Sequence, residues 1–167
     1  MTIRLSLLAA ALVLSGCSFF SRSAPPPPPV AATSVEEEDP ELPTGPIAFD
    51  LVGELEMNGG GNAARVYLYP LSSDATFLST PVQAFWGDPE GLLADDLAGT
   101  VRDATVRPGS TSSMEELDLG GAPFLGIAAD LRVPEGDAWR AILPATDVRG
   151  KAIQIRVLEG GITVRSR

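Results

Sequence analysis

The chain has no histidine and a single cysteine, Cys17, among its 167 residues. Without histidine, Ser-His-Asp and Cys-His catalytic sites are excluded, and so are most zinc sites. With one cysteine no intrachain disulfide can form, so a folded domain must rely on its apolar core. Aromatic residues make up only 6% of the chain, so Trp86 and Trp139 stand out. We expect both to be core residues rather than interface anchors.

Basic residues are also scarce. Lys and Arg number 12 against 22 Asp and Glu, which gives a formal net charge of −10. Proteins that bind nucleic acid carry clustered Lys and Arg, so this class of partner is excluded. The same acidity should keep the chain away from anionic lipid surfaces, unless a separate anchor holds it there.

The sequence offers no motif for catalysis. The triplet Gly59–Gly61 leads into a predicted strand rather than a helix and therefore lacks the context of a phosphate-binding loop. The acid pairs at Asp95–Asp96 and Glu115–Glu116 are adjacent in sequence, so their side chains diverge in a strand or a helix. Asp130 follows an apolar run and is expected at the solvent end of a strand. We therefore predict that the protein is not an enzyme and holds no metal or cofactor.

The N-terminus has the pattern of an export signal. Arg4 supplies a positive charge, Leu5–Leu14 an apolar stretch, and Ser15 and Gly16 the small residues before a cleavage site. The stretch is shorter than the ~20 apolar residues of a membrane-spanning helix. Leu14–Cys17 resembles the lipobox of bacterial lipoproteins, in which the cysteine receives the lipid. Residues 1–16 are thus predicted to be a cleaved signal peptide.

The mature chain is expected to begin at an acylated Cys17. Several acyl chains on one cysteine hold a protein to a membrane far more firmly than a single chain does. The following residue is Ser18 rather than aspartate. By resemblance to enterobacterial sorting, this favours the outer membrane.

Residues 17–46 are predicted to form a disordered tether. They contain the run Pro25–Pro29, the acidic run Glu36–Asp39, and further prolines at 40, 43 and 46. The segment has little apolar surface to bury, so ordering it would cost entropy without compensation. Proline runs favour the extended polyproline II conformation. We interpret the tether as a spacer without a partner of its own.

Residues 47–167 show the patterns of a folded all-β domain. Apolar residues alternate from Ile47 to Met57, and a second strand is expected over Arg65–Tyr69, with Pro70 ending it or confining it to an edge. Two short helices are expected after it, over Asp74–Thr80 and Asp88–Leu97, with Asp88 as the N-cap. The remaining strands are predicted over Thr100–Val106, Thr111–Leu119, Phe124–Leu131, Trp139–Leu143, Lys151–Leu158 and Ile162–Arg165.

This series gives seven or eight short strands, with the helices inserted after the second. Phe124–Leu131 is almost entirely apolar, as expected of a central strand covered on both faces. The last two strands flank Glu159–Gly161 and form a predicted hairpin. Short, regularly spaced strands are typical of a β-sandwich of two packed sheets.

Several short motifs, taken in order, resemble one family. They are Asn58 with Val66, Tyr69, Leu71 and Phe77; Phe85 followed by Leu92–Leu97; Pro108–Gly109; Phe124–Ala129 with Arg132; and Trp139–Arg140. Their order and spacing resemble the outer-membrane lipoprotein of the type VI secretion system, the TssJ, SciN or VasD family.

The resemblance implies a transthyretin-like β-sandwich with added helical elements and no catalysis. It also implies a role as an anchor in the outer membrane, with the domain facing the periplasm. There the family binds the periplasmic C-terminal region of a large inner-membrane protein of the TssM type and so holds the trans-envelope complex.

Loops at the ends of a rigid sandwich are natural binding surfaces. The glycine-rich segment between the first two strands should be an exposed and flexible loop. We predict that it contacts the partner, with two tyrosines of the next strand as supports. The candidate residues are Asn58, Gly59, Gly60, Gly61, Asn62, Tyr67 and Tyr69.

Two other functions remain open at the level of sequence. A small-ligand or glycan-binding lipoprotein could use the same type of sandwich, and a hydrolase is the third alternative. An apolar pocket with a few convergent polar groups would favour ligand binding. A flat or convex surface of loops would favour the anchor.

Overall fold

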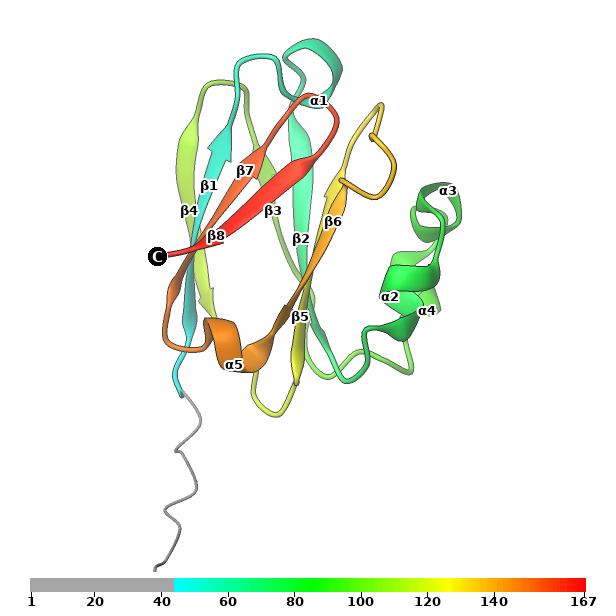
Figure 1. Cartoon of the computed structure of the whole chain (residues 1–167), viewed down its shortest axis with the longest axis vertical. Coiled ribbons are helices and arrows are strands. Elements are labelled where there is room, and N and C mark those ends of the chain that lie inside the picture. Colours follow the sequence, from blue (N-terminus) through cyan, green and yellow to red (C-terminus); the bar gives the residue numbers. More distant parts are fainter. Residues whose placement is uncertain (1–43) are drawn as a thin grey trace, which may run out of the picture. The chain divides into compact units, whose positions relative to one another are not determined.

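The computed structural model describes residues 44–167. The predicted signal peptide, the predicted lipidation site Cys17 and the predicted tether up to residue 43 lie outside the described residues. Within them, eight strands form two four-stranded sheets that pack face to face (Figure 1). The predicted β-sandwich with short inserted helices is confirmed. No helix of this part of the chain is long and apolar enough to span a membrane.

The first sheet has the order β4-β1-β7-β8. Its strands are β1 (Ile47–Gly53), β4 (Thr111–Leu117), β7 (Ala152–Val157) and β8 (Ile162–Ser166). β1 pairs antiparallel with β4 and parallel with β7, and β7 and β8 form the predicted hairpin. Every second residue of β1 and β7 is buried, as their alternation predicted.

The first strand is shorter than its alternation predicted. It ends at Gly53, where the turn between β3 and β4 crosses it so closely that a Cβ on Gly53 would lie 2.2 Å from the Arg107 carbonyl oxygen. The chain then turns away from the sheet. Leu55, which the alternation placed in the core, is therefore 73% exposed.

The second sheet has the order β3-β2-β5-β6. Its strands are β2 (Ala64–Leu71), β3 (Arg102–Val106), β5 (Phe124–Asp130) and β6 (Arg140–Pro144). β5 lies between β2 and β6, and residues 125–129 are all buried, so the predicted central strand is confirmed.

Pro70 lies inside β2 rather than at its end. Its partner in β5 is Leu125, while β3 pairs with β2 only as far as Leu68. The Pro70 carbonyl accepts a hydrogen bond from the Ala98 amide, 2.9 Å away. The missing N–H of Pro70 points the same way, to the side that β3 has already left. Pro70 is therefore confined to a locally open edge, and no ladder bond is lost.

Five short helices complete the described chain: α1 (Met57–Gly60), α2 (Ala75–Ser79), α3 (Val82–Phe85), α4 (Pro89–Leu92) and α5 (Ala145–Val148). α2 matches the helix predicted over Asp74–Thr80. The helix predicted over Asp88–Leu97 extends only to Leu92, although Asp88 caps it as predicted by accepting a hydrogen bond from the Gly91 amide at 3.0 Å. α1, α3 and α5 were not predicted.

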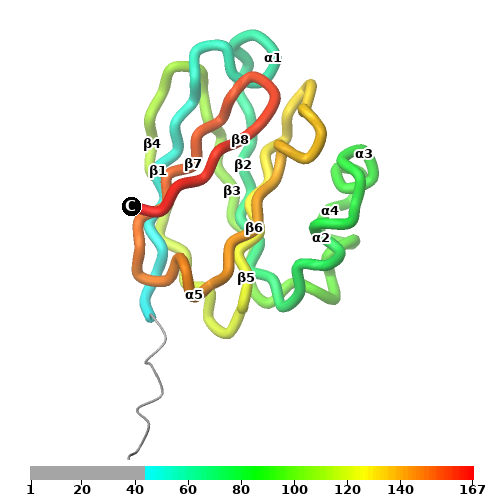
Figure 2. The backbone as a smooth tube through the Cα atoms, viewed as in Figure 1, coloured from blue at the N-terminus to red at the C-terminus, as the bar shows by residue number. Residues whose placement is uncertain are grey.

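The helical insertion α2–α4 lies on the outer side of the second sheet, away from the first (Figure 2). Aromatic rings fill the space between this insertion and the sheet. Phe77 and Phe85 from the insertion are fully buried against Tyr69 and Trp139, with Phe85 and Trp139 only 4.8 Å apart between ring centroids. Trp139 is a core residue, as predicted, and Trp86 is half-buried at the margin of the same cluster.

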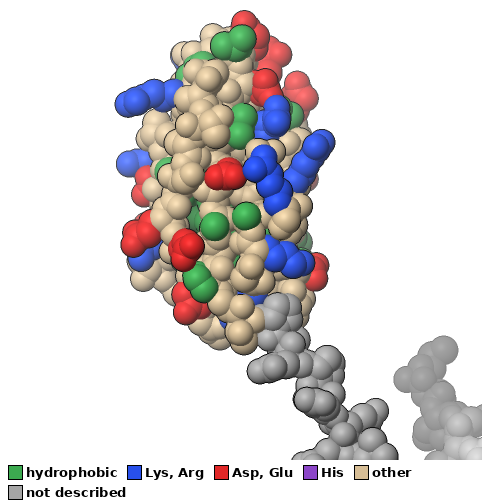
Figure 3. Space-filling view, turned by 90° about the vertical axis from the view of Figure 1, so that its left-hand side faces the viewer, with side chains coloured by type: hydrophobic (Ala, Val, Ile, Leu, Met, Phe, Trp, Pro, Cys, Tyr) green, Lys and Arg blue, Asp and Glu red, His purple; other side chains and the backbone are tan. Residues whose placement is uncertain are grey.

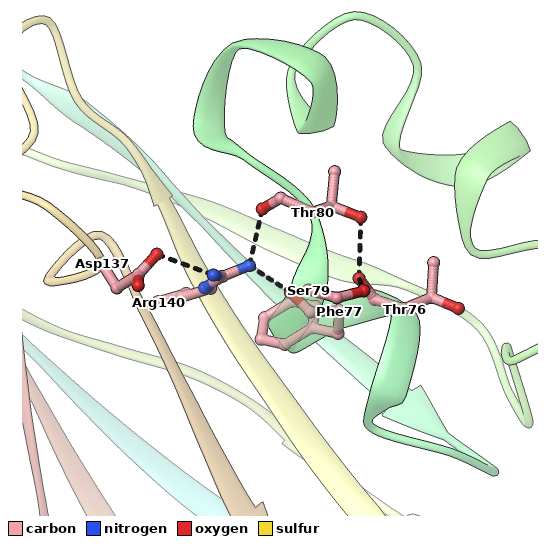
Figure 4. Close-up of polar contacts among 6 residues, drawn as sticks. All are labelled: Thr76, Phe77, Ser79, Thr80, Asp137 and Arg140. Carbon is pink, nitrogen blue, oxygen red and sulfur yellow. Dashed lines mark hydrogen bonds and ion pairs between the residues drawn. The ribbon is translucent and has the colours of Figure 1, made fainter.

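A buried cation fastens the insertion to the sheet (Figure 4). The Arg140 side chain on β6 is 6% exposed and donates to the carbonyl oxygens of Phe77 and of Thr80, the latter at 2.8 Å. It also pairs with Asp137 at 2.7 Å and stacks on the Trp139 ring. Carbonyls at the end of a helix lack intrahelical donors, so Arg140 supplies bonds that α2 itself cannot.

Replacing Arg140 by methionine should lower the free energy of unfolding by about 3 kcal/mol, because two carbonyls lose a charged donor where water is largely excluded. Urea unfolding of the purified domain measures this loss. Arg102→Met, at an exposed position in β3, is the matched control and should change stability by less than about 0.5 kcal/mol. Equal effects of the two substitutions would show that Arg140 does not fasten the insertion.

Candidate functional site

The segment between β1 and β2 is a structured turn built on Asn58. Its backbone has a φ of 52°, in the left-handed region, which asparagine tolerates better than most residues. Its side chain is buried: Oδ1 accepts from the Arg132 amide and Nδ2 donates to the Ala63 carbonyl, each at 2.6 Å. Asn58 therefore holds the turn in place, and its side chain is buried rather than presented to a partner.

The turn is also bonded to the hairpin between β7 and β8. The amides of Asn58 and Gly59 donate to the carbonyls of Leu158 and Glu159, both at 3.0 Å. Asn62 braces the turn from the other side, because its Oδ1 accepts from Arg132 Nη1 at 3.0 Å. The expectation of a flexible loop was wrong, since three separate loops share these hydrogen bonds.

The exposed part of this end of the sandwich contains Gly59, Gly60 and Gly61, flanked by two apolar side chains. Leu55 is 73% exposed and Val133 is 66% exposed. Neither was among the predicted site residues. The alternation of β1 placed Leu55 in the core, and nothing in the sequence near Val133 indicates that it approaches Gly59. We call this surface, made of Leu55, Gly59–Gly61 and Val133, the α1 surface.

Charged residues and two hollows surround the α1 surface. Glu56, Glu135 and Glu159 are exposed beside it. One hollow of about 380 Å³ lies between Val133 and the β7–β8 turn, and another of about 460 Å³ is lined by Asn62, Arg132 and Asp130, among others. Asp130 is exposed at the end of β5, as predicted.

The two predicted tyrosines do not join the α1 surface. They point from β2 toward the helical insertion, where Tyr69 is buried against Phe77 and Phe85. Tyr67 is half-buried between Tyr69 and Trp86, with ring centroids 6.1 and 5.4 Å away. Burial, followed by the nearby Tyr67, raises the pKa of Tyr69 above its ordinary value. These tyrosines support the insertion instead.

The described residues contain no group of three or more His, Cys, Asp or Glu side chains that could hold a metal ion. The acid pair Glu115–Glu116 lies in the edge strand β4, and both residues are exposed. The site is thus a surface of loops with exposed glycines and apolar side chains, bordered by charges of both signs such as Glu135, Glu159 and Arg132.

A family model of type VI secretion lipoproteins, described as VasD, EvfM and TssJ, matches residues 46–160. The chain belongs to this family. The match spans the sandwich from the entry of β1 to the β7–β8 turn and includes the whole α1 surface. Type VI secretion lipoproteins are structural components and not an enzyme family. No curated protein sequence matches the chain.

Solved structures of type VI secretion proteins share the fold. The TssJ1 lipoprotein of Pseudomonas aeruginosa is 23% identical, with a TM-score of 0.64 over 75% of this chain and 98% of that one. The Serratia marcescens Lip, a membrane-bound component of the type VI secretion system, is 16% identical, with a TM-score of 0.61 over 74% and 98%. A chain of the structure described as the TssM C-terminal domain (869–1107) from EAEC is 23% identical, with a TM-score of 0.63 over 71% and 99%.

Replacing Asn58 by alanine in this type VI secretion lipoprotein should destabilise it by about 4 kcal/mol, through two lost hydrogen bonds and a strained left-handed backbone. Asn58→Gly should cost about 1 kcal/mol less, since glycine adopts this φ freely. Urea unfolding of both variants measures the difference. Equal losses would mean that the left-handed backbone carries no strain for alanine.

The buried phenol of Tyr69 should make stability fall at alkaline pH. In the unfolded chain a tyrosine ionises near pH 10, whereas the raised pKa of Tyr69 keeps it neutral in the fold. The contribution of Tyr69 to the free energy of unfolding is fully present below about pH 10. It is lost progressively above that pH, because ionisation then favours the unfolded state. Unfolding in urea from about pH 8 to about pH 11 should show a steeper loss for the wild type than for Tyr69→Phe. Parallel curves would contradict this.

Proposed function

We propose that this chain is the outer-membrane-anchored lipoprotein subunit of a type VI secretion membrane complex. It binds the periplasmic C-terminal region of an inner-membrane partner of the TssM type. The observation that carries the proposal is the family match over residues 46–160, which follows a lipobox-like Leu14–Cys17 in the same chain.

Two of the similar chains support the choice of partner. One belongs to the structure described as the TssM C-terminal domain, and another, 22% identical with a TM-score of 0.65 over 73% of this chain, to a structure described as a type VI membrane complex. Both are covered almost completely, over 99% and 98% of their length, by the sandwich of this chain. Each therefore has about the size of one such domain.

In this proposal Cys17 carries the acyl chains that insert into the outer membrane, and the domain faces the periplasm. The tether, residues 17–46, would reach on the order of 100 Å if fully extended. This reach lets the lipoprotein meet a partner that rises from the inner membrane while its lipid stays in place.

The α1 surface is the proposed partner contact. Exposed apolar side chains such as Leu55 and Val133 can become buried anchors, while the glycines let a partner approach the backbone closely. The turn is fixed before binding by Asn58, so little ordering entropy opposes association. The apolar side chains predict apolar pockets on the partner, and the bordering charges Glu135, Glu159 and Arg132 predict complementary charges around them.

The small-ligand alternative receives no support from the helical insertion or from the surroundings of the α1 surface. The space between the helical insertion and the second sheet is filled by aromatic rings. The two hollows beside the α1 surface have mixed polar linings open to solvent, rather than an enclosed apolar pocket.

Substituting Leu55 or Val133 by aspartate should weaken partner binding at least tenfold each, about 1.4 kcal/mol, because each change places a charge in the apolar centre of the contact. Titration of the partner's purified periplasmic C-terminal region against each variant measures this. Leu92→Asp, at an exposed apolar position in α4, is the matched control and should bind normally. Wild-type affinity of both test variants would place the contact elsewhere.

Cys17→Ser should separate anchoring from recognition. The variant lacks the lipid and should leave the outer-membrane fraction, yet still capture the partner, because the α1 surface is unchanged. Membrane fractionation combined with a pull-down tests both parts. The anchor proposal fails if no large inner-membrane protein co-purifies with either form, or if the variant stays in the outer membrane.

A further inference from the structure

The end of the sandwich opposite α1 contains an apolar hollow beside the point where the described chain begins. The hollow has a volume of about 430 Å³, and its lining includes Thr44, Ala122, Pro123, Ala145 and Arg149. These residues come from the entry to β1, the β4–β5 loop, and α5 with the residue after it. A hydrogen bond from the Ala145 amide to the Pro123 carbonyl, 2.8 Å long, joins the last two parts.

The incoming chain is fastened at the wall of this hollow. Gly150 donates from its amide to the Gly45 carbonyl at 3.3 Å. Gly150 has a φ of +67°, and a Cβ at this position would lie 2.9 Å from the Thr44 carbonyl oxygen, so only glycine allows so close an approach. Thr44, the first described residue, therefore lies at the wall of the hollow.

Basic side chains are frequent in the C-terminal part of the chain. Residues 149–167 hold five of them, Arg149, Lys151, Arg156, Arg165 and Arg167, against one acid, Glu159. Arg156 lies toward the α1 end, where it pairs with Glu54 at 2.5 Å. Figure 3 shows Lys and Arg side chains on the right of this face, from its upper part to near its lower end, and others along the left margin among acidic side chains. Arg167 reaches Asp50 at 3.3 Å, but among the described residues no carboxylate lies within ion-pair distance of Arg149 or Lys151. The nearest acid on α5, Asp147, offers Lys151 its backbone carbonyl at 2.7 Å.

The five residues that precede Thr44 complement this surface. They read Asp39-Pro40-Glu41-Leu42-Pro43, with acids and apolar residues interleaved. At ~3.5 Å per residue, Leu42 lies within about 7 Å of Thr44 along the chain. Two prolines restrict the unbound conformations of the segment, which lowers the entropy lost when it is ordered.

We propose that the segment Asp39–Pro43 docks into this hollow. Leu42 packs against Ala122, Pro123 and Ala145, and the carboxylates of Asp39 and Glu41 lie against Arg149 and Lys151. The segment is covalently attached beside the hollow, so its effective concentration exceeds that of any free competitor.

Docking would make the last part of the predicted tether an extension of the domain. It would fix the direction in which the rest of the chain leaves, toward the side opposite the α1 surface. The domain would then present the α1 surface away from the membrane instead of reorienting freely at the end of the tether. The inference does not depend on the identity of the partner, because it concerns contacts within one chain.

Nuclear magnetic resonance of the unlipidated mature chain, residues 17–167 with Cys17→Ser, tests the proposal directly. We expect nuclear Overhauser effects between the Leu42 methyls and the methyls of Ala122 and Ala145. We also expect backbone order parameters at Glu41 and Leu42 near the rigid value of about 0.85. Leu42→Ser should remove these effects and lower the order parameter of Glu41 below about 0.6. Val35→Asn, a similar change farther along the tether, is the matched control and should leave them intact.

Charge has its own test in the same spectra. Lys151→Gln should weaken the Leu42 effects, and so should 1 M NaCl, where the screening length falls to about 3 Å. Arg107→Gln, which removes an exposed charge at the α1 end, should not.

Three outcomes would overturn the proposal. The first is order parameters below about 0.6 at both Glu41 and Leu42 without any contact to the hollow. The second is Leu42 contacts that appear only between differently labelled molecules, which would mean that a second copy fills the hollow. The third is a mobile Asp39–Pro43 together with Lys151-dependent binding to phosphatidylglycerol vesicles, which would assign the basic side to lipid.

Discussion

The buried amide of Asn58 is the interaction on which the α1 end of this lipoprotein depends. One side chain joins the turn after β1 to the end of β5 and to the start of β2, and the backbone beside it is bonded to the β7–β8 turn. A glycine-rich segment would otherwise lose much conformational entropy when it binds a partner. Because the Asn58 amide is buried and fully hydrogen-bonded, the turn loses its conformational entropy during folding, and the exposed glycines keep one conformation before binding.

Long-range contacts of single side chains also stabilise the rest of the domain, which has no disulfide. Arg140 fixes the helical insertion through carbonyls that α2 leaves unpaired, and aromatic rings fill the space beneath. The two ends of the sandwich are then free for different tasks. The α1 end offers exposed apolar side chains and glycines bordered by charges of both signs, while the opposite end offers an apolar hollow where the described chain begins.

Much of the fold could be predicted from the sequence, because alternation in β1, β7 and β8 and the apolar run of β5 report burial directly. The site could be predicted only in part. The glycines Gly59–Gly61 predicted a turn between the first two strands, but Asn58 resembled one more loop residue, since its partner amide at Arg132 lies 74 positions away. Leu55 was in phase with the core and was misplaced, because the crossing of Arg107 over Gly53 is a tertiary contact. The tyrosines match the alternation of β2 but face the insertion, which periodicity alone does not reveal.

We propose that the α1 surface, which is rigid before binding, is where this lipoprotein binds its inner-membrane partner. Amide hydrogen exchange, with and without the partner's periplasmic C-terminal region, tests it most directly. We expect binding to add protection at residues 55–61, 132–135 and 158–160. We also expect slow exchange at Asn58 and Gly59 already in the free protein. Protection confined to the helical insertion or to the end near Thr44, with α1 unchanged, would contradict it.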